Sequence, residues 1–181
     1  NGDLELAKRL IDEAVKAGRV KSFVFFNDGD RKINKHKKIG NTGGLYPIKG
    51  TSIDSIREKA RTAMQNGDGG DTPENNIEAL LYAAARNDTN TTYIMIADNL
   101  STPRDIELLK DFKQPVHVIA CSSQGGINHV YLKIARYTHG SVHMLHNDLY
   151  GLGDLGDGDV ITIGKERFHI KGPNFFSGDG Y

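Results

Sequence analysis

Acidic side chains stand at positions where this sequence predicts the ends of strands and the start of a helix. Asp98 directly follows an apolar run, Asp71 and Thr72 precede a helix start, and Asp28 and Asp30 follow a second apolar run. In open α/β sheets, ligands bind beyond the carboxyl ends of the strands. Magnesium prefers hard oxygen ligands such as carboxylates and hydroxyls. We therefore predict a site for Mg²⁺, or for Ca²⁺ or Mn²⁺, held by Asp98 together with Thr72 or Asp71.

The elements that would position these residues alternate between helix and strand. Thr72, Pro73 and Glu74 are typical of a helix start, with Thr72 as the N-cap. Residues 27–50 are expected to be a long polar loop. Helices are expected over 4–15, 52–65, 73–84, 103–112 and 127–137, and strands over 20–26, 92–97, 115–121 and 141–145. This order predicts an α/β fold: a Rossmann-like three-layer sandwich with a mostly parallel central sheet.

The composition changes after residue 147, where a Gly- and Asp-rich stretch begins. Residues 160–163 and 168–170 are apolar runs that flank a Gly-containing turn, which predicts a β-hairpin. We therefore expect an α/β domain over 1–147, followed by a linker, a hairpin and a tail over 148–181.

Charge and cysteine content exclude several classes of function. The chain has 23 Lys and Arg against 23 Asp and Glu, a net charge of zero that argues against nucleic-acid binding. The basic run from Arg31 to Lys38 is interpreted as a solvated loop. A single cysteine, Cys121, excludes a disulfide within the chain and is interpreted as a small core residue. No apolar run is long enough to predict insertion into a membrane, and the compartment, cytoplasmic or periplasmic, stays open.

The seven histidines show no His-x-x-x-His pair on a predicted helix, and we interpret them as structural or surface residues. An enzyme alternative begins from Asp28 and Asp30, whose spacing is similar to the Asp-x-Asp of haloacid-dehalogenase-type phosphatases. There the first aspartate is the nucleophile and the second the general acid, with magnesium. Lys32 stands where that pattern expects Thr or Val, so we keep this magnesium-dependent phosphatase as the alternative.

Residues 69–75 (GGDTPEN) and 92–98 (TYIMIAD) resemble two motifs of von Willebrand factor A (vWA) domains: the third metal motif, and the strand that ends in the metal-site aspartate. Residues 25–30 (FFNDGD) and the long Gly-containing loop after them resemble an uncharacterised bacterial subgroup of that family. Residues 115–121, with the pattern over 131–142, are similar to its last strand, helix and strand. The resemblance covers about residues 3–147. It implies a Rossmann-like sheet that carries a metal-ion-dependent adhesion site (MIDAS).

The sequence departs from this family in three places. The first metal motif, Asp-x-Ser-x-Ser on the central strand, is missing; Gly-Gly-Thr is replaced by Gly-Gly-Asp-Thr; and Thr-Asp-Gly is replaced by residues 97–99 (ADN). The metal site is therefore expected to be incomplete in this chain. The strands over 23–26 and 93–97 are expected to flank an empty position, or one that a foreign strand fills.

These observations favour a non-enzymatic protein-binding or assembly module. Its cation would capture an acidic group from a protein partner, which supplies a carboxylate or the missing strand. Asp28, Ser122 and Ser123 are expected at the partner-binding rim of the site. A scaffold with a vestigial metal site is the third hypothesis.

Overall fold

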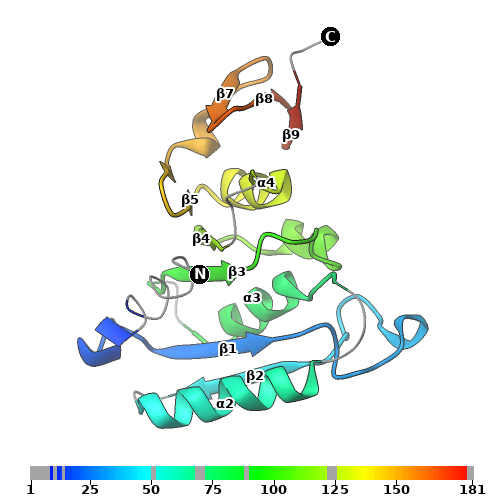
Figure 1. Cartoon of the computed structure of the whole chain (residues 1–181), viewed down its shortest axis with the longest axis vertical. Helices are drawn as coiled ribbons and strands as arrows, with labels where there is room; N and C mark the ends of the chain where they lie inside the picture. The colour runs from blue at the N-terminus through cyan, green and yellow to red at the C-terminus, as the bar shows by residue number, and fades with distance from the viewer. Residues whose placement is uncertain are drawn as a thin grey trace. The chain divides into compact units, whose positions relative to one another are not determined.

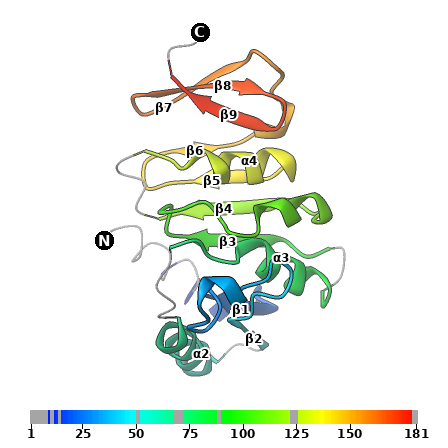
Figure 2. The same cartoon turned by 90° about the vertical axis from the view of Figure 1, so that its right-hand side faces the viewer.

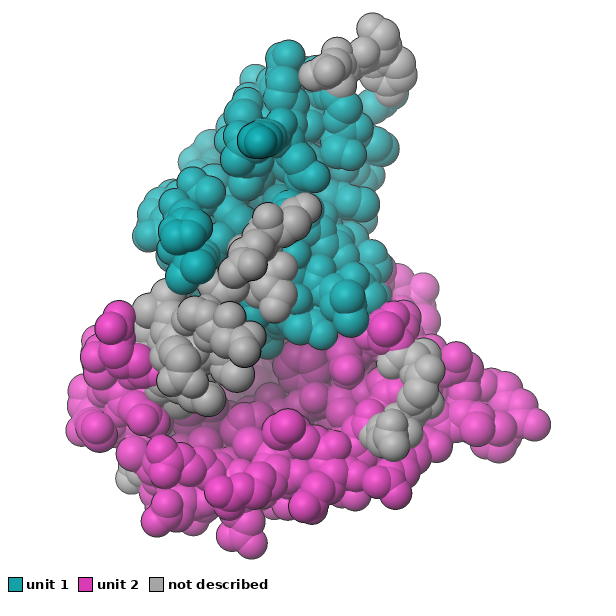
Figure 3. Space-filling model, viewed as in Figure 1, with its two compact units in different colours: residues 1–4, 89–102, 113–181 teal, residues 5–88, 103–112 magenta. Residues whose placement is uncertain are grey.

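The computed structural model describes residues 9, 12–13, 15–49, 52–67, 72–87, 90–121 and 126–178. The chain divides into two compact units, which Figure 3 colours separately. Unit 1 comprises residues 1–4, 89–102 and 113–181, and unit 2 comprises residues 5–88 and 103–112. This division differs from the expected boundary at residue 147, because the chain passes from unit 2 into unit 1 and back before it ends in unit 1.

Unit 1 contains a four-stranded sheet in the order β3-β4-β5-β6 (Figures 1 and 2). Strands β3 (Tyr93–Ala97), β4 (Val116–Ala120) and β5 (Ser141–His143) are parallel, and β6 (Asp148–Leu149) is antiparallel to β5. The three parallel strands lie within the predicted ranges, and with their connecting helices they confirm an α/β class. Strand β6 was not expected, because two residues are too few for a pattern of alternation.

Helix α4 (His129–Tyr137) packs on one face of this sheet. Apolar residues of the helix and of the strands beneath it are fully or almost fully buried: Val116, Val118, Val130, Tyr131, Leu132, Ile134, Ala135 and Val142. The chain enters β5 from α4 through Gly140, where a Cβ atom would lie 1.8 Å from the carbonyl oxygen of Val116. Only glycine allows this approach, so Gly140 sets how closely the helix and the sheet pack.

The predicted C-terminal hairpin is present in unit 1. Strands β7 (Val160–Ile163) and β8 (Glu166–Lys171) pair antiparallel, and a third strand, β9 (Asn174–Ser177), pairs with β8 where the sequence had suggested a tail. Phe168 and Phe175 are buried beneath this sheet. Because β9 contacts α4, the three strands extend the core of unit 1 beyond the helix.

Unit 2 contains a two-stranded antiparallel sheet of β1 (Ser22–Phe26) and β2 (Leu45–Lys49). The expectation that residues 27–50 form only a loop was therefore wrong for β2. Pro47 and the glycines before it argued against a strand, but proline is tolerated on a strand at the edge of a sheet. The loop between the two strands includes a short 3₁₀ helix, η1 (Asn34–His36).

Helix α2 (Ile53–Asn66) begins as predicted after Ser52, whose hydroxyl accepts the Ser55 N–H at 3.4 Å. The predicted N-cap role of Thr72 was wrong, because α3 (Asn76–Ala84) begins later. The expected helix over 103–112 is the 3₁₀ helix η2 (Ile106–Asp111). A bilayer-spanning segment is not present among the helices of the described ranges.

Strands β1 and β3 belong to different sheets. Direct pairing of these strands would have contradicted the expected empty or foreign strand position between them. The existence of that position stays a prediction.

The outer edge of β1 carries backbone groups that point away from β2. The Asn27 N–H donates to the Gly44 carbonyl at 3.1 Å, which makes these two residues a hydrogen-bonded pair of the antiparallel ladder. Pairs alternate along the ladder, so Phe23 and Phe25 bond to β2, whereas Val24 directs its N–H and C=O to the opposite edge. In the ranges that the structure describes, no residue accepts from the Val24 N–H.

This edge can be tested by amide hydrogen exchange of the isolated chain. We expect the Val24 amide to exchange faster than the amides of Phe23 and Phe25, because only the latter two donate within the sheet. A partner that supplies a strand at this edge would slow exchange at Val24 and leave exchange at Phe23 and Phe25 unchanged. Equal protection of all three amides in the isolated chain would contradict an open edge.

Candidate functional site

Asp98 is exposed at the carboxyl end of β3, on a turn that side chains hold in place. Its Oδ1 accepts the Leu100 N–H at 3.0 Å. Asn99, at φ +64°, bridges to the segment before α4: its Oδ1 accepts the Asn128 N–H at 2.8 Å and its Nδ2 donates to the Gly126 carbonyl at 2.9 Å. The second oxygen of Asp98 has no hydrogen bond to any described residue. Asp98 therefore presents a carboxylate oxygen to solvent from a fixed turn.

The other expected ligands of the cation are Thr72 and Asp71, and Ser122 and Ser123 are expected at the rim of the site. Thr72 is exposed and belongs to unit 2, whereas Asp98 belongs to unit 1. Asp71, Ser122 and Ser123 lie outside the described residues. Convergence of Asp98 with Thr72 or Asp71 stays a prediction. Within the described ranges, no three His, Cys, Asp or Glu side chains come together as a metal site.

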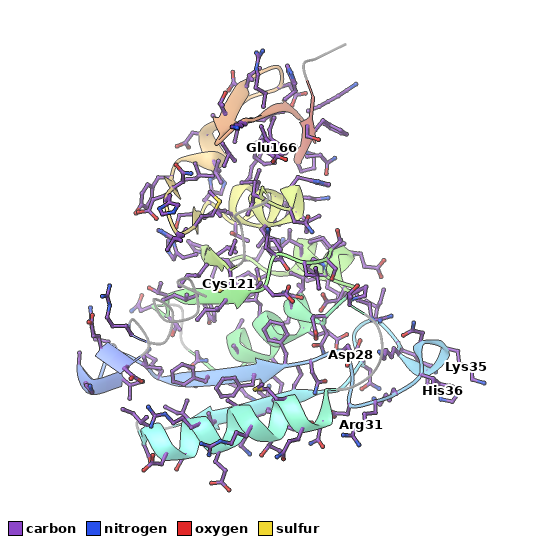
Figure 4. All side chains as sticks on the ribbon, viewed as in Figure 1. Asp28, Arg31, Lys35, His36, Cys121 and Glu166 are labelled. Atoms are coloured by element: carbon purple, nitrogen blue, oxygen red, sulfur yellow. The ribbon has the colours of Figure 1, made fainter. Side chains whose placement is uncertain are left out.

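Asp28 is not at a rim in this structure. It follows the end of β1 (Figure 4), is only 1 % exposed, and accepts a hydrogen bond from the Lys37 ammonium through Oδ2 at 3.0 Å. Its Oδ1 is buried without a hydrogen-bond partner among the described residues. Contact with a partner through Asp28 would require this ion pair to open, so its expected role at the rim is corrected to a buried one.

Asn27 and Asp30 hold the turn after β1. Asn27 Oδ1 accepts the N–H groups of Gly29 and Asp30 at 2.9 and 3.1 Å, and its Nδ2 donates to Asp30 and to the Ala63 carbonyl of α2. Asp30 also accepts the Gly44 N–H at 3.1 Å. The carboxylate that the phosphatase alternative needs as a general acid is thus engaged in backbone and side-chain hydrogen bonds.

The first turn of α3 anchors the same loop through Glu78. Glu78 Oε1 accepts the Gly40 N–H at 2.9 Å and the Thr42 hydroxyl at 2.6 Å, and its Oε2 accepts the Thr42 N–H at 3.0 Å. Asn75, just before α3, donates to the Gly43 carbonyl. Because Thr42 and Asn75 are fully buried, these bonds tie residues 40–43 to the start of α3.

Asp105, immediately before η2, caps α3 from outside the helix. The Glu78 N–H donates to Asp105 Oδ2 at 2.6 Å, and the Asp105 side chain is fully buried. Burial raises the pKa of Asp105 to about 6, and the neighbouring Glu78 charge adds to this rise, whereas backbone N–H groups oppose it. Desolvation of the carboxylate therefore outweighs the hydrogen bonds that favour its charged form.

Sequence reasoning missed two buried charged residues of unit 2 that hold the loop after β1: Lys37, which pairs with Asp28, and Glu78, which binds Gly40 and Thr42. Lys37 appeared within a solvated basic run, and its neighbours Lys35 and His36 are indeed exposed (Figure 4). Glu78 lies within the helix expected over 73–84, and the sequence assigned it no role. Glu78 binds residues 36 and 38 positions before it, and Lys37 lies 9 residues after Asp28; a helix or strand pattern marks neither spacing. The histidines that we interpreted as structural or surface residues include two in a hydrogen-bonded chain, described below.

Comparisons with protein-family models, with curated proteins and with solved structures found no match to this chain.

The polar residues of the two units have distinct roles in the geometry described above. Unit 2 uses its buried charges to hold a loop, and unit 1 presents Asp98 to solvent.

The buried ion pair can be tested by removing one partner. Lys37→Met leaves the Asp28 carboxylate buried and uncompensated, and we expect a loss of about 3–5 kcal/mol in the free energy of unfolding. The double variant Asp28→Asn, Lys37→Met should be more stable than Lys37→Met alone, because it removes the buried charge. Urea denaturation measures both, with Lys35→Met as the exposed control. Equal losses in Lys35→Met and Lys37→Met would contradict the pair.

The raised pKa of Asp105 predicts how stability depends on pH. The folded chain binds the Asp105 proton more tightly than the unfolded chain, so this stabilisation is complete below the ordinary pKa and is lost as pH rises through about 6. Relative to Asp105→Asn, the wild type should lose up to about 3 kcal/mol between about pH 4 and about pH 7. Urea midpoints at several pH values measure this, with exposed Asp111→Asn as control. A constant difference across this range would contradict it.

Proposed function

We propose that this chain is a non-enzymatic protein-binding or assembly module of the vWA type, which engages a partner through a divalent cation at the carboxyl edge of its sheet. The observation that carries the proposal is Asp98: an exposed carboxylate held on a rigid turn at the end of a parallel strand. This is the edge at which open α/β sheets bind ligands.

The proposed chemistry is that of a shared cation. Asp98 holds Mg²⁺ directly or through water, and the Thr72 hydroxyl or the Asp71 carboxylate is the second ligand. Magnesium keeps several waters and uses few protein oxygens, so a partner carboxylate has a free position to occupy. The three-layer Rossmann-like arrangement and the strand position between β1 and β3 belong to the same proposal.

Two alternatives differ from it in measurable ways. A phosphatase that uses Asp28 and Asp30 would need both carboxylates free for substrate, whereas Asp28 pairs with Lys37 in a buried site and Asp30 is hydrogen-bonded. A vestigial scaffold would bind no cation. These differences define the arms of one experiment.

Calorimetric titration of the whole chain with MgCl₂ tests the proposal. We expect Asp98→Ala to weaken binding by at least about tenfold, because few protein oxygens share the ion. Thr72→Val removes only the hydroxyl and should weaken binding less if Asp71 can replace it. Glu107→Gln, an exposed carboxylate outside the site, is the matched control and should bind as the wild type does.

The remaining outcomes contradict the proposal. Absence of magnesium binding to the wild type would favour a vestigial site. Magnesium-dependent hydrolysis of a phosphomonoester, lost in Asp28→Asn, would favour the phosphatase. Equal binding by the wild type and Asp98→Ala would place the cation elsewhere.

A further inference from the structure

Four polar side chains of the unit 1 sheet form a continuous hydrogen-bonded chain. His143 Nδ1 lies 2.8 Å from Asp148 Oδ1, His143 Nε2 lies 2.7 Å from Ser141 Oγ, and the same Oγ lies 2.7 Å from His117 Nδ1. His117 is the register partner of Ser141, and Asp148 is the register partner of His143. The chain therefore crosses three strands, β4, β5 and β6. We call these four residues the histidine relay.

The direction of each hydrogen bond follows from Asp148, the carboxylate at one end of the relay. An ionised carboxylate only accepts, so His143 Nδ1 carries a proton and donates to Asp148. In a neutral His143 the Nε2 atom is then an acceptor, and it receives the Ser141 hydroxyl proton. The Ser141 oxygen in turn accepts from His117 Nδ1. Both imidazoles are thereby set to the Nδ1–H form, and His117 Nε2 keeps a lone pair.

This lone pair is the open end of the relay. His117 Nε2 has no hydrogen-bond partner among the described residues. His169 Nε2 is buried without a partner, whereas His117 Nε2 is not among such buried atoms. His117 and His143 are half-buried, whereas Ser141 is 1 % exposed. A proton from solvent can thus reach His117, whereas a substrate carbon cannot reach the Ser141 hydroxyl. The geometry favours proton transfer over nucleophilic chemistry at this serine.

The surroundings of the relay contain few other charges. By register, the neighbours of His117 and His143 on the same face are Ile94 and Ile119. The Tyr150 ring, which follows β6, meets the His143 ring edge-on at 5.5 Å between centroids. Asp148 is the one carboxylate that contacts either imidazole in the described part of the chain.

We propose that the histidine relay is a proton-binding site, which takes up one proton at His117 Nε2 and holds it on His143 beside Asp148. A proton adds to His117 Nε2 while His117 Nδ1 passes its own proton to Ser141 Oγ. The Ser141 hydroxyl proton passes to His143 Nε2. One proton has entered, every hydrogen bond between the two imidazoles has reversed, and His117 is neutral again in the Nε2–H form.

The charge rests on His143 for a physical reason. Burial lowers the pKa of His117, and the positive charge of His143 lowers it further. A cationic His143 instead lies in ion-pair contact with Asp148 at 2.8 Å. The relay therefore moves the charge from His117, whose charged form burial disfavours, to the imidazole that lies beside a carboxylate.

Nitrogen NMR of the histidine side chains in the whole ¹⁵N-labelled chain tests this proposal, because it distinguishes the two neutral forms of each imidazole. At about pH 8, both His117 and His143 should be in the Nδ1–H form. As the pH falls and His143 becomes charged, His117 should change to the Nε2–H form without gaining charge. His117 in the Nε2–H form at the higher pH, or a His117 form that does not change with pH, would overturn the proposal.

Two variants of Ser141 separate a relay from a merely structural serine. Ser141→Ala removes the connecting hydroxyl, so the form of His117 should no longer follow the charge of His143. Ser141→Thr keeps a hydroxyl on a residue suited to strands and should restore the coupling. The backbone amide spectrum of each variant reports whether the sheet is intact. Coupling that persists in Ser141→Ala would overturn the proposal.

Two further variants test the charge. Asp148→Asn keeps an oxygen acceptor for His143 Nδ1 but removes the negative charge. The relay should then take up its proton at lower pH. At high pH, both imidazoles should remain in the Nδ1–H form. His146→Gln, on the exposed turn before β6, should change neither property. Unchanged proton uptake in Asp148→Asn, or covalent labelling of Ser141 by an organophosphonate, would overturn the assignment.

Discussion

Unit 2 depends on the requirement that buried polar groups find partners. Asp28, Lys37, Thr42, Asn75, Glu78 and Asp105 are all buried, and an unpaired charge among them would cost several kcal/mol. The ion pair and the hydrogen bonds that these groups make join the loop after β1 to the first turn of α3. These contacts hold the loop at residues 37 and 40–43, whereas residues 30–36 between them are exposed to solvent.

The parallel strands could be predicted because each is an apolar run bounded by polar residues. Val116, Val118 and Val142 face α4 and are fully buried, and such segments carry their signal in their own composition. Strands β2 and β6 carried no such signal. Pro47 in β2 is tolerated only because of where the strand pairs, and the pairing of β6 depends on the return of the chain after β5.

Helix starts show the same limit. Ser52 caps α2 through a contact three residues away, so this helix begins where the periodicity over 52–65 had placed it to within one residue. Thr72 and Pro73 have equally good local chemistry, yet α3 begins at Asn76, where Asp105 accepts the Glu78 N–H. The cap comes from 27 residues further along the chain. Sequence reasoning could place Asp98 at the end of a strand. It could not identify Lys37 as the partner of Asp28, because the two lie 9 residues apart in an irregular loop, where no helix or strand periodicity marks a contact.

Unit 1 thus carries two polar features with opposite relations to water. Asp98 directly follows edge strand β3 and has an oxygen toward solvent, whereas the histidine relay spans β4 to β6 and encloses Ser141. A cation needs ligands that keep their negative charge, whereas the proposed relay takes up a proton that His143 then carries as a positive charge. The two features use no residue in common, since β3 contributes only apolar neighbours to the relay. Cation binding at Asp98 and proton uptake at His143 can therefore succeed or fail separately, and each proposal is judged on its own residues.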